Sequence, residues 1–267
     1  MNFFPMDIET FLDGGHLSRA DIVLVRGTSL FSRAIRFATR SPFSHAALIF
    51  LIPDRQSGFE RTFLIEAVPK GISIRGIADA IGAGPGKGPK TALAVLRLER
   101  PWFNADVQKI VRGRMLDFVR AGYDWSTILG IATSVISGMF LGQASYARAM
   151  RSSLTRDYEK KRLVPADFIC SGLVQYGFLR TIFDLSDRDG TIIPIGGVAD
   201  AIFSTRLTGV DPEKIIARSP RALAELLAIT PDEISRAPTL TWKYVLVDGK
   251  AHAVANRDDA MKVLEVN

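Results

Sequence analysis

Short apolar runs separated by turn residues fill the first hundred positions of the chain, and this pattern predicts strands. The runs at 20–26, 43–52 and 61–68 are rich in β-branched residues and are bounded by glycine, proline or polar residues. Two shorter runs, at 71–75 and 92–98, follow the same pattern. Residues 1–19 are expected to form a helix or an arm, and a helical pattern from Leu30 to about Ser41 separates the first two strands.

Helical spacing replaces this pattern after residue 100. The segment 104–121 is expected to be a helix whose buried side carries Val107, Ile110, Val111, Leu116 and Phe118. Prolines at 212, 220 and 231 are typical of the first positions of short helices. The segments 239–247 and 250–254 flank Asp248-Gly249, which predicts a closing hairpin.

The order of strands, then helices, then a hairpin predicts an α+β fold with an antiparallel sheet packed against helices, rather than a doubly wound sheet. The length of 267 residues allows one large domain or two small ones, and we expect a single domain over 1–267. It would carry a helical, uncharged insertion at about 125–147 and a C-terminal helical and hairpin extension at about 195–267.

Two segments have an unusual composition. Residues 125–147 contain no charged residue and have the length of a membrane span, but several serines, threonines and glycines dilute the apolar character. A buried helical hairpin, a transmembrane helix and an apolar lid over a lipid-like substrate all fit this pattern. Residues 82–90 are rich in glycine and proline but lack the Gly-Lys-Ser/Thr ending of a phosphate loop, which favours a linker or lid.

Charge and composition narrow the classes of partner. The net charge is +6, and basic residues cluster only at 148–162, either as a solvated face or as a surface for anionic lipid. No nucleic-acid-binding motif accompanies the charge, so no nucleic-acid partner is expected. The N-terminus shows no signal-peptide pattern, which predicts a cytoplasmic or membrane-peripheral protein.

Cys170 is the only cysteine, which excludes an internal disulfide and a multi-thiolate zinc site. Asp167 is expected to cap a helix that begins just after it, and this would place Cys170 in the first turn. The free N–H groups and the positive dipole end of such a turn favour a thiolate. The alternative is that Cys170 is a small buried apolar residue without a chemical role.

A thiolate nucleophile needs a base and a group that orients the base. Among the three histidines, His45 is the best placed because it begins a predicted strand directly after a loop, whereas His16 lies in the N-terminal arm and His252 in the hairpin. Glu66 lies inside an apolar strand, where a carboxylate is costly unless paired. His45 on a neighbouring antiparallel strand is one suitable partner, and Arg75 or solvent is the alternative.

Three blocks of sequence resemble the NlpC/P60 cysteine peptidases. Residues 167–176 resemble the nucleophile motif, 20–25 the Gly-Asp strand block, with Ala20 in place of the glycine, and 44–49 the Ser-His strand block. The histidine precedes the cysteine by 125 residues, an order that is similar to the circularly permuted branch of YiiX-like and lecithin:retinol acyltransferase-like papain folds. Residues 65–67, Ile-Glu-Ala, resemble that branch's third catalytic block, and 121–124 its Gly-x-Tyr-Asp block.

The resemblance implies a permuted papain-like fold with Cys170 as nucleophile, His45 as base, Glu66 as the residue that orients it, and Tyr123 lining the site. It implies no metal and no other cofactor. The expected activity is hydrolysis or acyl transfer at an amide or ester bond, on cell-wall-type peptides or amide-linked lysine substrates. The alternatives are an acyl-lipid hydrolase or acyltransferase at a membrane surface, and a catalytically silent papain-like binding domain. His252 is the alternative base.

Overall fold

The computed structural model describes residues 5–39, 41–54, 58–68, 71–81, 91–118, 122–123, 167–168, 170–189, 199–203 and 229–266. The expected loop at 82–90, the uncharged stretch at 125–147, the basic run at 148–162 and the helix starts at 212 and 220 lie outside these residues.

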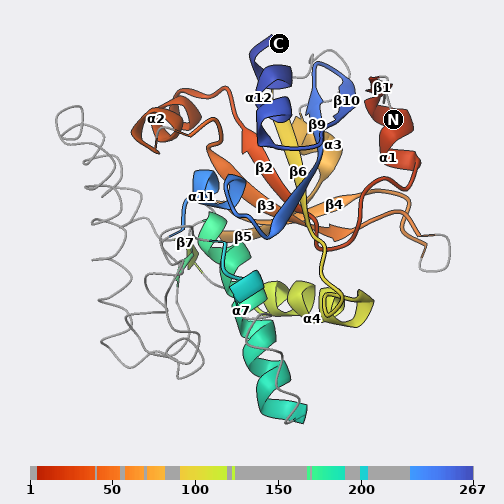
Figure 1. Cartoon of the computed structure of the whole chain (residues 1–267), viewed down its shortest axis with the longest axis vertical. Coiled ribbons are helices and arrows are strands. Elements are labelled where there is room, and N and C mark those ends of the chain that lie inside the picture. Colours follow the sequence, from red (N-terminus) through yellow and green to blue (C-terminus); the bar gives the residue numbers. More distant parts are fainter. Residues whose placement is uncertain are drawn as a thin grey trace.

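One eight-stranded sheet organises the described part of the chain (Figure 1). Its order is β1-β10-β9-β6-β2-β3-β4-β5, and every neighbouring pair is antiparallel. The strands are β1 (Met6–Asp7), β2 (Ile22–Arg26), β3 (His45–Leu51), β4 (Phe63–Val68), β5 (Gly71–Gly76), β6 (Ala92–Leu98), β9 (Leu240–Val247) and β10 (Lys250–Ala253). The α+β class with an antiparallel sheet packed against helices is therefore confirmed.

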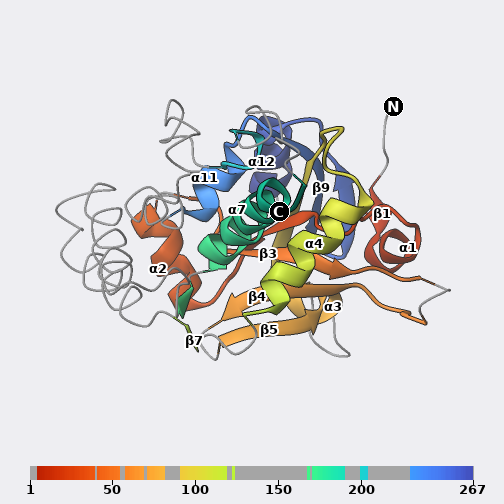
Figure 2. The same cartoon turned by 90° about the horizontal axis from the view of Figure 1, so that it is seen from below.

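Both faces of the sheet are covered, because its central strands are apolar on both sides. On β2, Ile22 and Leu24 belong to one core and Val23 and Val25 to the other. The first core includes residues of α4 (Ala105–Leu116), α7 (Cys170–Asp189), α11 (Pro231–Ser235) and α12 (Arg257–Val266). The second includes residues of α1 (Ile8–Asp13) and α3 (Ile77–Ile81). Figure 2 shows α4 and α7 side by side on the same face.

Several boundaries differ from the sequence predictions. Strand β1 was not expected, helix α12 lies within the expected C-terminal helical and hairpin extension, and the short α3 follows β5 directly. In α4, Leu116 is exposed whereas Met115 is fully buried, because Met115 continues the helical row of Val107 and Val111. The hairpin at the C-terminal end is joined to the main sheet through the pairing of β9 with β6, with Val245 in one core and Leu246 in the other.

The turn that leads into β2 contains a residue in the left-handed backbone region: Ala20 has φ of 65°, a conformation that glycine adopts without steric cost. Asp21 follows it at 1% exposure and accepts hydrogen bonds from Arg97 Nε at 2.7 Å and from the Ser18 N–H at 2.8 Å.

Candidate active site

Helix α7 begins at Cys170, whose residue exposure is 8%. The prediction that Asp167 caps this helix is wrong. Asp167 lies with Phe168 in strand β8 (Asp167–Phe168), which pairs in parallel with β7 (Gly122–Tyr123), and the helix begins only at Cys170. Cys170 nevertheless occupies the first turn, where backbone N–H groups have no partner within the helix.

His45 is the first residue of β3, and a fixed turn holds it there. The segment 27–44 leaves the sheet after β2, carries α2 (Leu30–Thr39) and returns at Ser44. The Ser44 N–H donates to the Val25 carbonyl at 2.9 Å, and the Ser44 hydroxyl accepts from the Gly27 N–H at 3.3 Å. These hydrogen bonds hold the two ends of the segment together and fix the backbone directly before His45.

Glu66 on β4 contacts both partners that the sequence offered as alternatives. His45 Nε2–H donates to Glu66 Oε2 at 2.6 Å, and Arg75 Nη2 donates to the same oxygen at 3.1 Å. Arg75 Nε also pairs with Glu66 Oε1. The Glu66 side chain is 1% exposed, so a carboxylate there needs these two cations. The backbone pairing between β3 and β4 stops at Leu48 and Ile65, so it does not extend to His45 and Glu66.

The Cys170 sulfur interacts with His45, by charge and by a side-chain hydrogen bond, and with the backbone N–H groups of Ala46 and Ser171. Nε2 is the ring nitrogen of His45 that binds Glu66. The contacts therefore form a continuous row from Arg75 through Glu66 and His45 to Cys170.

These contacts shift the pKa values in opposite directions. Burial raises the pKa of the Cys170 thiol, but the charge and hydrogen bond of His45 and the two N–H donors bring it below its ordinary value. Burial lowers the pKa of His45, yet the Cys170 thiolate and the Glu66 carboxylate raise it to about 10. The pKa of Glu66 is lowered: burial opposes this, and His45 and Arg75 outweigh it. All three shifts favour a thiolate–imidazolium pair.

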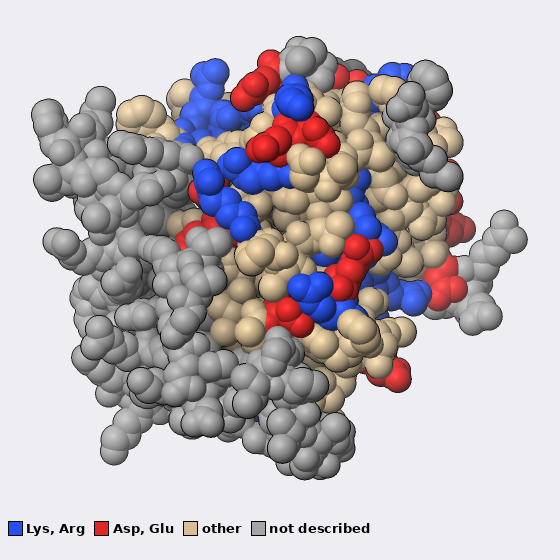
Figure 3. Space-filling view, viewed as in Figure 1, with Lys and Arg blue, Asp and Glu red and all other residues tan. Residues whose placement is uncertain are grey.

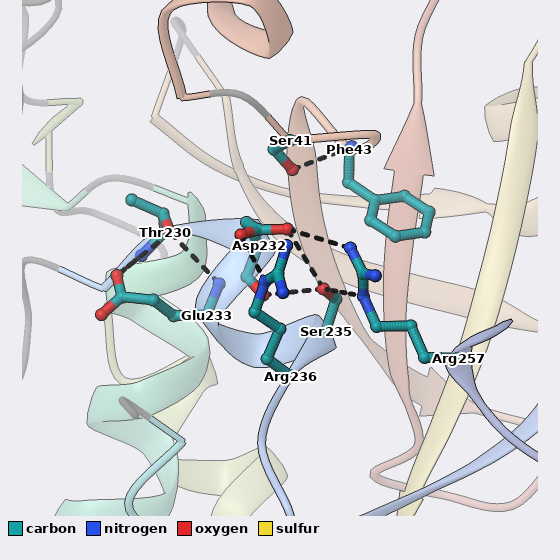
Figure 4. Close-up of polar contacts among 8 residues, drawn as sticks. All are labelled: Ser41, Phe43, Thr230, Asp232, Glu233, Ser235, Arg236 and Arg257. Atoms are coloured by element: carbon teal, nitrogen blue, oxygen red, sulfur yellow. Dashed lines mark hydrogen bonds and ion pairs between the residues drawn. The ribbon is translucent and has the colours of Figure 1, made fainter. Parts of the chain in front are cut away.

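The residues that lead into helix α11 contact the first turn of α7, and the sequence did not indicate this contact. The Ser171 hydroxyl donates to the Ile229 carbonyl at 2.6 Å, and Thr230, next in the chain, caps α11 with Glu233 in a capping box. Figure 4 shows this helix and the network behind it. There Asp232 pairs with Arg236 at 2.8 Å and with Arg257 of α12 at 3.4 Å. Ser171, the residue after Cys170, is thus hydrogen-bonded to the C-terminal part of the chain.

Replacement of Ser171 with alanine should lower the free energy of unfolding by about 1–3 kcal/mol, because it leaves the buried Ile229 carbonyl without its donor. The matched control is Thr181→Ala in the same helix, whose buried hydroxyl donates to the Gly177 carbonyl four residues back. That carbonyl keeps its helical N–H donor, so the control should lose less. Urea unfolding of both variants measures the difference, and equal losses would contradict the role given to α11.

The remaining candidates lie elsewhere. The His16 ring stacks on Phe11 with centroids 5.2 Å apart. His252 lies in β10, separated from β3 by β9, β6 and β2, which corresponds to roughly 19 Å across the sheet. It is therefore not placed to act as the base for Cys170. The Tyr123 backbone pairs with Phe168, two residues before Cys170, but its side chain lies outside the described part of the structure.

Comparisons with known proteins give little further information. No protein-family model matches the chain, and no curated protein matches it. Among solved structures, the chain is similar to the metalloprotein YiiX from Escherichia coli O157:H7, with 15% identity, a TM-score of 0.43, and coverage of 87% of this chain and 98% of that one. Within the described residues, no group of three or more histidine, cysteine, aspartate or glutamate side chains is arranged to hold a metal ion.

No helix in the described ranges combines the length and the apolar character needed to cross a membrane.

Proposed function

We propose that this protein is a papain-like cysteine hydrolase or acyltransferase of the permuted NlpC/P60 type, which acts on an amide or ester bond through an acyl-thioester intermediate. One observation carries the proposal: His45 binds the buried Glu66 carboxylate through Nε2 and also interacts with Cys170, the sole cysteine of the chain. A nucleophile, a base and a residue that orients the base, each within hydrogen-bond reach of the next, is the arrangement that nucleophilic acyl transfer requires.

In the first half-reaction the Cys170 thiolate attacks the carbonyl carbon, and a carbon–sulfur bond forms while the carbonyl oxygen becomes an oxyanion. The backbone N–H groups at the first turn of α7 would donate hydrogen bonds to that charge. The oxyanion then collapses, the bond to the amine or alcohol breaks, and the His45 imidazolium gives its proton to the leaving group. The product that remains on the enzyme is a thioester on Cys170.

In the second half-reaction the now neutral His45 removes a proton from water or from an acceptor alcohol or amine. The resulting nucleophile attacks the thioester carbon, and the carbon–sulfur bond breaks to return the thiolate. His45 is again an imidazolium, so the ion pair is restored. Throughout both halves Glu66 keeps the imidazole in one orientation and stabilises its positive form.

Arg75 is a positioning residue in this scheme because it contacts Glu66 and not the sulfur. Arg75→Met should lower kcat/KM by about tenfold, the cost of a less well oriented base. Arg75 is among the groups that lower the pKa of Glu66, so without it Glu66 takes up a proton at a higher pH as the solution is acidified. The acid limb of the kcat/KM profile should therefore move to higher pH.

The hydrolysis of p-nitrophenyl esters over a range of pH measures this shift. Arg75→Lys keeps a cation beside Glu66 and should move the acid limb less than Arg75→Met. Arg100→Met is the matched control, since the Arg100 side chain has the same 36% exposure and pairs with Asp200. An acid limb at the wild-type pH in Arg75→Met would show that Arg75 has only a structural role.

The proposed activity is tested by trapping its intermediate. The protein is mixed with p-nitrophenyl esters and with activated peptide amides, quenched in acid, and analysed by mass spectrometry. We expect an acyl adduct on the peptide that contains Cys170, and faster decay of that adduct when an acceptor amine or alcohol is added would favour acyl transfer over hydrolysis. Turnover without any adduct, undiminished in Cys170→Ala, would refute the proposal, and absence of both adduct and turnover would favour a silent binding domain.

An acyl-lipid substrate is the second candidate. The observation that favours it is a surface of exposed apolar and basic side chains on α2, the helix that immediately precedes His45. Cell-wall-type peptides should compete with the ester substrate if the peptide alternative is correct, whereas phospholipid vesicles should compete if the lipid alternative is correct.

A further inference from the structure

Helix α2 presents large apolar side chains to solvent. Leu30 and Phe37 are 83% and 68% exposed, the two highest values among the large hydrophobic residues described. They are seven residues apart, two turns of helix, and therefore lie on the same side. Arg33, also exposed, lies between them on that side. No residue of α2 whose burial is described is buried.

The charged side chains on and next to α2 are basic and have no acidic partner among the described residues. Helix α2 contains no acidic residue, and Arg26, Arg33 and Arg36 form no ion pair with any acidic side chain in the part of the chain that the structure describes. Burial, together with the positive charges of Arg26 and Arg33, lowers the pKa of Arg36. In Figure 3 basic side chains gather at the upper left, where Figure 1 shows α2.

We propose that the outer face of α2 docks on an anionic lipid bilayer, with Leu30 and Phe37 inserted among the acyl chains and Arg33 and Arg36 paired with lipid phosphates. A helix with apolar residues on one side and arginines beside them suits the boundary between headgroups and hydrocarbon. A bilayer supplies both an apolar layer for the two large side chains and anionic partners for the arginines, which have none among the described residues.

The position of α2 connects this surface to the candidate active site. In Figures 1 and 2, α2, α11, β7 and the first turn of α7 lie at the same end of the molecule. The Ser44 hydrogen bonds to Val25 and Gly27 hold together the two ends of the segment that carries α2, and His45 is the next residue. A bilayer bound at α2 would thus lie on the side of the molecule that carries the first turn of α7. The docking itself does not depend on the proposed chemistry.

Co-sedimentation with vesicles tests the docking in the full chain carrying Cys170→Ala, which binds without turnover. Vesicles of phosphatidylcholine with about one-third phosphatidylserine should be bound more tightly than vesicles of phosphatidylcholine alone, and added salt should weaken that binding. The double variant Leu30→Ser and Phe37→Ser should lower the affinity about tenfold or more. Arg33→Gln and Arg36→Gln should each lower it about fivefold.

Matched controls change similar residues elsewhere. Phe59→Ser removes a large apolar side chain that is 41% exposed, and Lys109→Gln removes one exposed charge from α4; neither should alter vesicle binding. Wild-type affinity in the Leu30 and Phe37 double variant would overturn the proposal. So would loss of a dimer in that variant without any change in vesicle binding, because α2 would then be an interface between protein chains.

A label gives an independent measurement. In the Cys170→Ala chain an introduced cysteine is the only one, so an environment-sensitive fluorophore reports a single position. A probe on Phe37→Cys should shift to shorter wavelength when anionic vesicles are added, whereas a probe on Phe59→Cys should not. A shift at Phe59→Cys alone would place the bilayer elsewhere and contradict the proposal.

Discussion

Cys170→Ala should abolish turnover, with a loss in kcat of about 10⁴-fold or more, because the variant has no atom that can form the acyl intermediate. The sulfur is the end point of the contacts that run from Arg75 through Glu66 and His45. The measurement is the rate of hydrolysis of p-nitrophenyl esters by the purified variant and by the wild type.

The control for this prediction is the fold of the variant. Cys170 is a buried residue at the start of α7, and alanine is smaller, so unfolding in urea should show only a modest loss of stability. A folded Cys170→Ala protein that hydrolyses the ester at the wild-type rate would end the assignment of Cys170 as the nucleophile.

His45→Ala should lower kcat/KM by about 10³-fold, the second largest effect, because one residue supplies both proton transfer and the charge that stabilises the thiolate. The loss should exceed that of Glu66→Gln, since Glu66 orients and charges the imidazole without exchanging a proton with substrate. Ester hydrolysis at neutral pH compares the two variants directly.

His252→Ala is the matched control for the histidine. His252 lies in β10, on the far side of β2, β6 and β9 from β3, and should be dispensable for turnover. Equal losses in His45→Ala and His252→Ala would point to a general effect on the fold. Full activity of His45→Ala together with a large loss in His252→Ala would reverse the assignment of the base.

Much of the sheet was predictable because its strands have strong local signals. The run at 92–98 matches β6 residue for residue, and the runs that contain His45 and Glu66 became the adjacent strands β3 and β4. The antiparallel pairing and the cost of a carboxylate in an apolar strand predicted His45 as one suitable partner of Glu66, with Arg75 or solvent as the alternative. That Arg75 also binds Glu66 depends on the register of β5, since Ser73 is opposite Glu66 and Arg75 is two residues further on the same face.

Other features depend on contacts between distant residues and have no local signal. Asp167 has the residue type of a helix cap, but its pairing with Gly122 in β7 places it in a strand instead. The bond from Ser171 to the Ile229 carbonyl joins residues 58 positions apart, and nothing near Ser171 indicates it. The exposure of Leu30 and Phe37 likewise could not be foreseen, because their helical spacing is equally typical of a buried face.

The pH dependence of alkylation at Cys170 tests the central claim most directly, since the chain has no other cysteine to react. The thiolate is the reactive form, and the His45 imidazolium that stabilises it loses its proton only as the pH rises through about 10. The wild-type rate with iodoacetamide should therefore stay high through neutral pH and fall only well below about 8.5, the pKa of an ordinary thiol, whereas His45→Ala should titrate at or above that value, because burial then acts without its main opponent. A wild-type rate that titrates near the ordinary value, unchanged in His45→Ala, would contradict the account.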